Sequence, residues 1–103
     1  MNYIVTPSTP LNLSSSVDTS QYAQENVFIS CTGGACTVNL QAQSNYKGSP
    51  NIYVLANPGA ATTVNFGGGD NIFTGGASAT SFTVAAGTSA ILKPAGNGLW
   101  VAK

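Results

Sequence analysis

The chain has 103 residues, of which three are lysine, three are acidic and none is arginine or histidine, so its formal net charge is zero. A chain of this length holds a single core, and its few basic residues argue against nucleic-acid binding, which needs lysine and arginine to neutralise phosphates. Without histidine it lacks the usual general base and the commonest metal ligand, so we expect no enzymatic activity, no cofactor and no metal site. No apolar run reaches the roughly 20 residues of a membrane-spanning helix, so we expect no membrane partner either.

The scarcity of charge is itself informative. Charged residues make up 6% of the chain, against a usual share of about 25%. Soluble monomers normally carry mixed surface charges and a net charge that opposes association. A chain without this protection is typical of a protein whose surface is covered by copies of itself or by a larger assembly. The alternative is a domain kept in solution by serine, threonine and asparagine alone.

The first 25 residues differ from the rest. Residues 7–10 read Pro-Ser-Thr-Pro and are excluded from a central strand, because proline has no ladder donor. Residues 11–16 alternate weakly at most. We therefore expect residues 1–25 to form an extended N-terminal arm with one strand at its start, and residues 26–103 to form the body. The arm would be held either by a neighbouring subunit or by strand addition to the domain's own sheet.

Beyond the arm, β-branched and aromatic residues occur in short runs separated by Gly, Pro, Asn and Ser, and no long segment has a helical apolar period. This pattern predicts an all-β fold. Counting the strand at the start of the arm, strands are expected at residues 3–6, 27–31, 36–40, 52–56, 62–66, 71–73, 81–85, 89–92 and 99–102.

An internal repeat is the most specific organisational feature. Residues 26–40 (NVFISCTGGACTVNL) match residues 51–66 (NIYVLANPGAATTVNF), at an offset of 25 in the first strand and 26 in the second. A looser third copy is AILKPAGNGLWV at residues 90–101. Each copy reads as a hairpin with a Gly-containing turn. Two clear copies and a looser one argue against a long solenoid, so we predict a small antiparallel sandwich or barrel built from repeated hairpins.

Apolar and aromatic residues occupy both faces of the first strand in each clear copy. Val27 and Ile29 alternate with Phe28, and Ile52 and Val54 alternate with Tyr53. One face must line the core. The other is either a wet face that carries aromatic rings or a subunit contact, and the low charge favours a contact.

Cys31 and Cys36 enclose the turn Thr-Gly-Gly-Ala. In a hairpin with Gly33 and Gly34 at its tip, the two cysteines would face each other with Cα atoms about 4.5–5.5 Å apart, which is within disulfide range. The sequence leaves open a disulfide formed after release from the cell and a pair of packed thiols, as a reducing compartment would give. Two cysteines without histidine are too few for a zinc site.

The carboxylates offer little chemistry. A glycosidase needs two of them across a cleft, and nothing in the sequence pairs any of Asp18, Glu25 and Asp70. Asp70 ends a Gly-Gly-Gly run that lacks the lysine of a phosphate loop and the repeated aspartates of a calcium loop, so we interpret it as part of a flexible turn.

Aromatic rings could instead form a platform for sugars. The candidates are Tyr3, Tyr22, Tyr46, Tyr53 and Trp100. We expect these rings to fill the core or an oligomer interface, where aromatic residues are enriched. Trp100, between two apolar residues, is predicted to be an anchor in one of those places.

The C-terminal half carries a family resemblance. A glycine turn leads into an apolar strand (TVAAGTSAIL, residues 83–92), followed by GNGLW at residues 96–100, and Thr-Val-Asn and Gly-rich loops precede them. Over roughly residues 51–103 this resembles the small β domains of tailed-bacteriophage virion proteins. These include head decoration (cement) proteins, head fibres and tail-fibre tips.

The resemblance implies a non-enzymatic virion protein, and we expect a capsid decoration protein on the capsid exterior. The first residues lack the basic start and apolar stretch of a signal peptide, so we expect synthesis in the host cytoplasm. The implied partners are the chain itself, as a homotrimer, and the major capsid protein. The expected assembly contacts are Tyr3, Ile4, Val5, Leu11 and Leu13 of the arm, together with Trp100. The alternative is a head-fibre or tail-fibre module that binds a host-surface glycan.

Overall fold

The structure, a computed structural model, describes residues 2–13, 26–46, 51–74 and 77–102. Apart from one short 3-10 turn, η1 (Gln43–Asn45), every regular element in this part of the chain is a strand, which confirms the all-β prediction. All the predicted strands are present, with ends within two residues, whereas β2 and β8 were not foreseen. The strands are β1 (Asn2–Val5), β2 (Leu11–Leu13), β3 (Asn26–Cys31), β4 (Cys36–Leu40), β5 (Asn51–Leu55), β6 (Thr62–Asn65), β7 (Asn71–Thr74), β8 (Ala77–Ala79), β9 (Ser81–Val84), β10 (Ser89–Pro94) and β11 (Leu99–Ala102).

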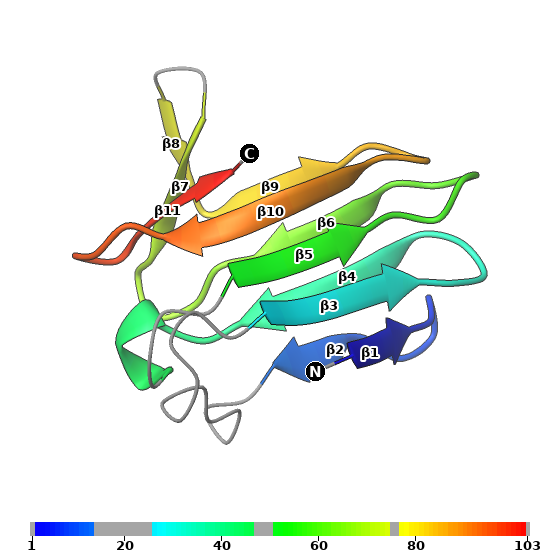
Figure 1. Ribbon diagram of the computed structural model, residues 1–103, viewed down its shortest axis with the longest axis horizontal. Coiled ribbons are helices and arrows are strands. Elements are labelled where there is room, and N and C mark those ends of the chain that lie inside the picture. Colours follow the sequence, from blue (N-terminus) through cyan, green and yellow to red (C-terminus); the bar gives the residue numbers. More distant parts are fainter. Residues whose placement is uncertain (1, 14–25, 47–50, 75–76, 103) are drawn as a thin grey trace.

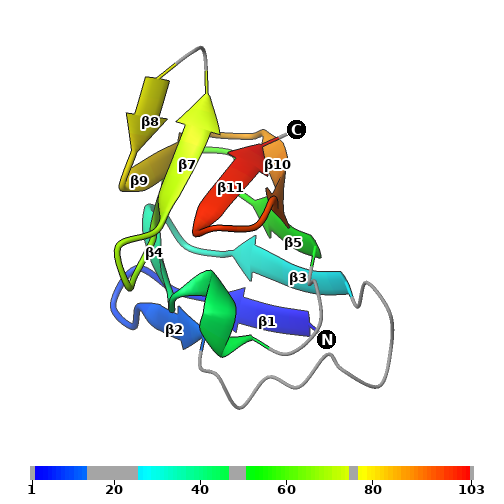
Figure 2. The ribbon, with the colours of Figure 1, turned by 90° about the vertical axis from the view of Figure 1, so that its left-hand side faces the viewer.

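The strands form two mixed sheets that lie face to face (Figures 1 and 2). The larger sheet has the order β1-β3-β5-β10-β11-β7-β8, and the smaller has the order β2-β4-β6-β9. In both sheets the first three strands run parallel to one another, and the next strand is antiparallel to them. The core lies between the sheets.

The two clear copies of the repeat are successive coils of a short solenoid-like stack. β3 pairs in parallel with β5, and β4 pairs in parallel with β6, so one copy lies directly on the other. The pairing register equals the sequence offset, because Asn26 lies opposite Asn51 and Thr37 lies opposite Thr63. The repeat in the sequence is therefore the length of one coil.

This arrangement corrects the prediction of an antiparallel sandwich or barrel of repeated hairpins. β3 and β4 belong to one copy but lie in different sheets, and the chain passes between them at residues 32–35. Each clear copy is thus an arch whose strands pair with the neighbouring copy rather than with each other. Of the three expected hairpins, only the looser third copy is one, since β10 and β11 pair antiparallel in the larger sheet. The expected hairpins failed because alternation along a strand looks the same in a hairpin and in an arch.

The described part of the expected arm supplies the first coil of the stack. β1 pairs in parallel with β3, and β2 pairs in parallel with β4. The chain's own sheets therefore hold residues 2–13, which is the second of the two alternatives that the sequence left open. The rest of the expected arm, residues 14–25, lies outside the described residues.

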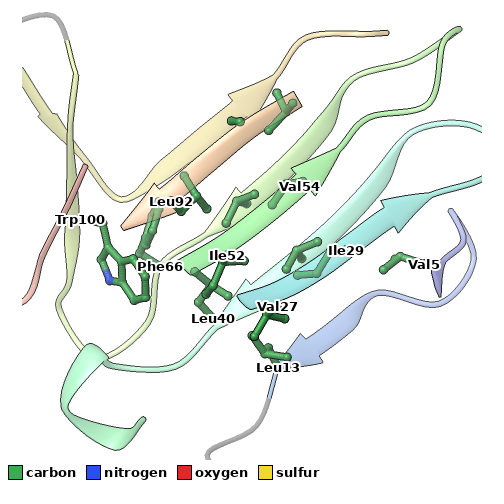
Figure 3. Packing of buried hydrophobic residues seen from close by; sticks show 14 of the residues in the cluster. Val5, Leu13, Val27, Ile29, Leu40, Ile52, Val54, Phe66, Leu92 and Trp100 are labelled. Atoms are coloured by element: carbon green, nitrogen blue, oxygen red, sulfur yellow. The ribbon is translucent and has the colours of Figure 1, made fainter. Parts of the chain in front are cut away.

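The core consists of inward-facing side chains from every coil (Figure 3). The strand register places apolar residues of similar size beside one another. Val27 of β3 lies beside Ile52 of β5, and Ile52 lies beside Leu92 of β10. All three side chains are fully buried. Burying a side chain of this size contributes roughly 1.5–3 kcal/mol, so these rows hold successive coils together along the stack. Trp100 of β11 is also fully buried and packs against Phe66, with ring centroids 5.9 Å apart.

Successive coils approach closely where the chain leaves β6. A Cβ on Gly67 would lie 2.5 Å from the carbonyl oxygen of Leu40, and a Cβ on Gly68 would overlap the Cβ of Ala42. Gly68 also has a φ of 66°, in the left-handed region that disfavours other residues. Glycine at this point therefore lets one coil rest on the turn of the coil before it.

We predict that Gly68→Ala lowers the free energy of unfolding by about 2–4 kcal/mol, because left-handed strain adds to overpacking. Gly69→Ala is the matched control, since Gly69 has a φ of 82° but nothing within 4 Å of its Cβ position. It should cost only about 1–2 kcal/mol, from backbone strain alone. Urea unfolding of both variants measures the difference. Equal losses would show that the close approach to Ala42 is unimportant.

Candidate functional site

The outer face of the larger sheet carries large hydrophobic side chains interspersed with asparagine, serine and Lys93. In the described part of the chain, every large hydrophobic residue that is exposed lies on this face: Ile4 (76% exposed), Phe28 (39%), Leu55 (42%) and Phe73 (48%). Tyr53, Ile91, Leu99 and Val101 are half-buried and point the same way, because they alternate with buried neighbours along their strands. We call these eight side chains the apolar face.

Strand register arranges the apolar face in rows. Phe28, Tyr53 and Ile91 are direct neighbours across β3, β5 and β10. The rings of Phe28 and Tyr53 are stacked on each other, with centroids 4.7 Å apart and an interplanar angle of 22°. The two aromatic rings thus form one rigid ridge that stands on the sheet.

The outer face of the smaller sheet is polar and uncharged. Its outward side chains are Asn12, Thr37, Asn39, Thr63, Asn65, Ser81 and Thr83, which we call the polar face. A ladder of side-chain amides runs across it, because Asn39 Nδ2 donates to Asn12 Oδ1 at 2.8 Å and Asn65 Nδ2 donates to Asn39 Oδ1 at 2.9 Å. The ladder fixes the register of the first three coils from outside the core.

The molecule therefore has two unlike sides. The sequence indicated that aromatic residues occupy the second face of β3 and β5, and the structure shows that this face continues across β1, β10, β11 and β7. Phe73 lies at the far end of this face, on β7. The pairing of β7 with β11 brings it into the larger sheet. The sequence does show apolar residues at positions that alternate with buried ones, which is the signal that could have identified this face. It did not show which strands share a sheet.

Most of the expected assembly contacts are occupied in the chain's own core. Val5, Leu13 and Trp100 are at most 2% exposed, and Tyr3 and Leu11 are partly buried and pack against the core. Ile4 alone among the six projects outward. As the chain is folded here, candidate contacts are better sought on the apolar face.

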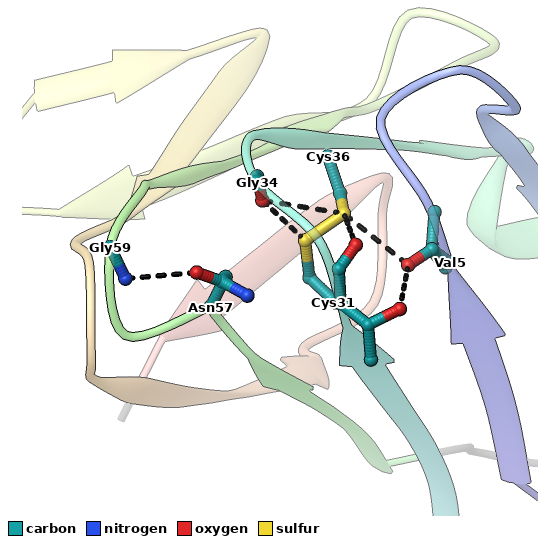
Figure 4. The surroundings of a disulfide bond; sticks show 7 residues. Val5, Cys31, Gly34, Cys36, Asn57 and Gly59 are labelled. Atoms are coloured by element: carbon teal, nitrogen blue, oxygen red, sulfur yellow. Dashed lines mark hydrogen bonds between the residues drawn. A yellow bond between two sulfur atoms is a disulfide. The ribbon is translucent and has the colours of Figure 1, made fainter.

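Cys31 and Cys36 are joined by a disulfide, with Cα atoms 5.9 Å apart (Figure 4). The bond closes the arch between the two sheets, because β3 and β4 lie in different sheets. The carbonyl oxygen of Gly34 lies 2.8 Å from Cys31 Sγ, and that of Val5 lies 3.4 Å from Cys36 Sγ. A disulfide sulfur has no proton to donate, so these are polar contacts that only a reduced thiol would convert into hydrogen bonds.

Asp70 is a structural residue that the sequence did not reveal. It is 5% exposed, and its Oδ2 accepts hydrogen bonds from Trp100 Nε1 at 3.0 Å and from the backbone N–H of Gln43 at 2.6 Å. Gln43 in turn donates to the carbonyl oxygen of Leu99 at 2.9 Å and accepts from the N–H of Gly96 at 3.0 Å. These bonds connect the turn before β7, η1 and the β10–β11 hairpin, so residues 67–70 form a fixed turn rather than the expected flexible one.

The other candidate groups do not converge. Asp18, Glu25 and Tyr22 lie outside the described residues. The structure therefore gives no distance between the carboxylates that a glycosidase would need to pair. Tyr3 and Tyr53 point to opposite sides of the larger sheet, and Trp100 is buried. The described aromatic candidates therefore do not make one sugar platform.

Tyr46 is also enclosed. Its hydroxyl donates to the carbonyl oxygen of Leu13 at 2.7 Å and accepts from the backbone N–H of Gln41 at 2.9 Å. Burial raises the pKa of Tyr46 above its ordinary value of 10.0, although the N–H of Gln41 acts in the opposite direction. The protonated hydroxyl can therefore bridge the first and second coils.

Residues 2–13, 26–46, 51–74 and 77–102 contain no group of three or more His, Cys, Asp or Glu side chains placed to bind a metal ion. In the same residues no helix is long and apolar enough to cross a membrane. No protein-family profile matches the chain, and no curated protein or solved structure is significantly similar to it.

We predict that Asp70→Ala lowers the free energy of unfolding by roughly 3 kcal/mol, because two buried N–H donors lose a charged acceptor. Asp70→Asn keeps an oxygen in that position and should cost clearly less. Thermal unfolding followed by Trp100 fluorescence measures both. Similar losses for Ala and Asn would mean that the carboxylate charge, and not the acceptor geometry, stabilises this turn.

Thr62 of β6 is fully buried, and its Oγ1 has no hydrogen-bond partner. We predict that Thr62→Val raises the free energy of unfolding by about 1 kcal/mol, because a methyl replaces an unsatisfied hydroxyl of similar shape. The control is Thr63→Val on the polar face, which should change stability by less than about 0.5 kcal/mol. Urea unfolding of each variant provides the comparison, and a loss of stability in Thr62→Val would show that the hydroxyl has a partner.

Proposed function

We propose that this chain is a non-enzymatic virion structural protein of the capsid decoration type, which acts by burying its apolar face at a boundary between protein subunits. The observation that carries the proposal is the contrast between the two sheets. The exposed large hydrophobic residues of the described chain gather on one side, and the other side is an ordered array of hydroxyls and amides. Exposed large hydrophobic side chains that gather on one side of a protein mark a candidate interaction site.

The mechanism is mechanical, since burial of Phe28, Leu55 and Phe73 against a neighbour would stabilise the contact by the hydrophobic effect. Lys93 is the one charged side chain among the described residues of both outer faces. Association should therefore depend only weakly on salt. Many uncharged copies could also sit side by side without mutual repulsion, and the polar face would remain in water. The phage assignment itself rests on the resemblance of residues 51–103 to virion β domains.

The structure changes which experiment tests this role. Deleting residues 2–13 would remove β1 and β2 together with the buried Val5 and Leu13, so it would damage the fold as well as any contact. Point substitutions on the apolar face avoid this problem.

A fibre module that binds a host glycan is the alternative, and its best candidate platform is the Phe28–Tyr53 ridge. Sugars stack on free, flat ring faces. In this ridge each ring covers one face of the other, with ring centroids 4.7 Å apart. This geometry favours a protein contact over a sugar platform.

The test is the copy number of the chain in purified virions, by quantitative mass spectrometry against the major capsid protein. A copy number comparable with that of the capsid protein is expected for decoration. A few copies per particle would support the fibre alternative, and adsorption of the purified protein to host cells or a glycan array would then examine it. Complete absence from virions would refute both.

A further inference from the structure

We propose that the first occupant of the apolar face is a second copy of this chain, packed sheet against sheet. This inference rests on the proposed burial of that face, but it does not depend on the virion. It identifies the partner by the chemistry of the surface, and three observations on that surface support it.

The first observation is size. The apolar face belongs to the seven-stranded sheet. Its strands β1, β3, β5 and β10 lie side by side across the broad side of the molecule in Figure 1, and β11, β7 and β8 turn away from them at one end, as Figure 2 shows. The whole molecule measures 33 by 31 Å across and 20 Å through. A standard protein interface buries about 800 Å² per partner. The broad side of a molecule with these dimensions, on which β1, β3, β5 and β10 lie, is comparable in size with one partner's share of such an interface.

The second observation is charge. Among the described residues, Lys93 is the one charge on the outer side of this sheet, and the remaining polar side chains beside the apolar face are asparagine and serine. A strongly acidic or basic partner would find no complementary charge there. A copy of the chain presents the same neutral surface, so pairing creates no repulsion apart from that between two lysines, whose long stems can carry the ammonium groups to the rim.

The third observation is shape. The apolar side chains lie on β-strands, and their rows follow from strand register rather than from mobile loops. Two such faces related by a two-fold axis can pack as sheets do inside a sandwich, about 10 Å apart. The stacked rings of Phe28 and Tyr53 would then insert between side chains of the other copy, and aromatic residues are enriched in such contacts.

The experiment is sedimentation equilibrium of the full-length chain across a wide concentration range. We expect a mass above that of the monomer. Phe28→Lys should weaken association by more than about tenfold, because it places a charge at the centre of a dry contact. The matched control is Thr63→Lys, which adds the same charge mid-strand on the polar face and should leave association unchanged. Circular dichroism and urea unfolding check that each variant folds.

Two further variants keep the inference testable if Phe28→Lys does not fold. Leu55→Lys, at another exposed position of the face, should also weaken association by more than about tenfold. Lys93→Met should strengthen self-association several-fold, because it removes the one charge that the described residues place on the outer side of this sheet. A trimer that the same variants dissociate would support burial of this face between copies, but it would overturn the two-fold, sheet-against-sheet packing.

A monomer at every concentration would overturn the inference, and so would an oligomer that Thr63→Lys disrupts and the apolar-face variants do not. These outcomes are distinct from failure of the proposed function. A monomer that is abundant in virions would leave the decoration role standing, whereas an oligomer that is absent from virions would leave only the self-association.

Discussion

In-register stacking of parallel coils is the constraint on which the rest of the structure depends. Each strand of one coil pairs with the equivalent strand of the next, so backbone hydrogen bonds along the stack replace the hairpins that neighbouring strands would otherwise form. Side chains alternate along a strand, and register therefore acts on both sides of a sheet at once. The pairing that places Val27 beside Ile52 in the core also places Phe28 beside Tyr53 outside it.

The same rule explains why the two outer faces are chemically opposite. On the smaller sheet, register repeats Thr-Val-Asn and produces a ladder of amides with hydroxyls beside it. On the larger sheet it repeats strands with large hydrophobic residues on both faces, so the outer side carries the apolar face among asparagine and serine side chains. The polar ladder satisfies its own hydrogen bonds while it remains in water. The apolar face has no such compensation, and the burial that we propose would remove its side chains from water.

The end of the stack depends on a different kind of interaction. β9 and β10 run antiparallel to the coils, and β11, β7 and β8 then widen the larger sheet. A buried carboxylate stabilises this end, because Asp70 accepts hydrogen bonds from Trp100 and Gln43 and so fixes three segments that are distant in sequence. Glycines 67 and 68 bring the same turn against the preceding coil. This end of the molecule therefore relies on a few specific polar and steric contacts as well as on apolar burial.

The sequence by itself determined the strands other than β2 and β8, the length of the repeat and the scarcity of charge that would oppose association, because these follow from alternation, turn residues and composition. It also placed Cys31 near Cys36, since any chain reversal over so few residues does so. Only the tertiary structure decided that the repeats pair with each other and that residues 2–13 form the first coil. It also decided that Asp70 meets Trp100, 30 residues away, and that Phe73 shares a face with Phe28. Hairpins and arches have the same pattern of alternation, and long-range partners are set by which strands meet in space.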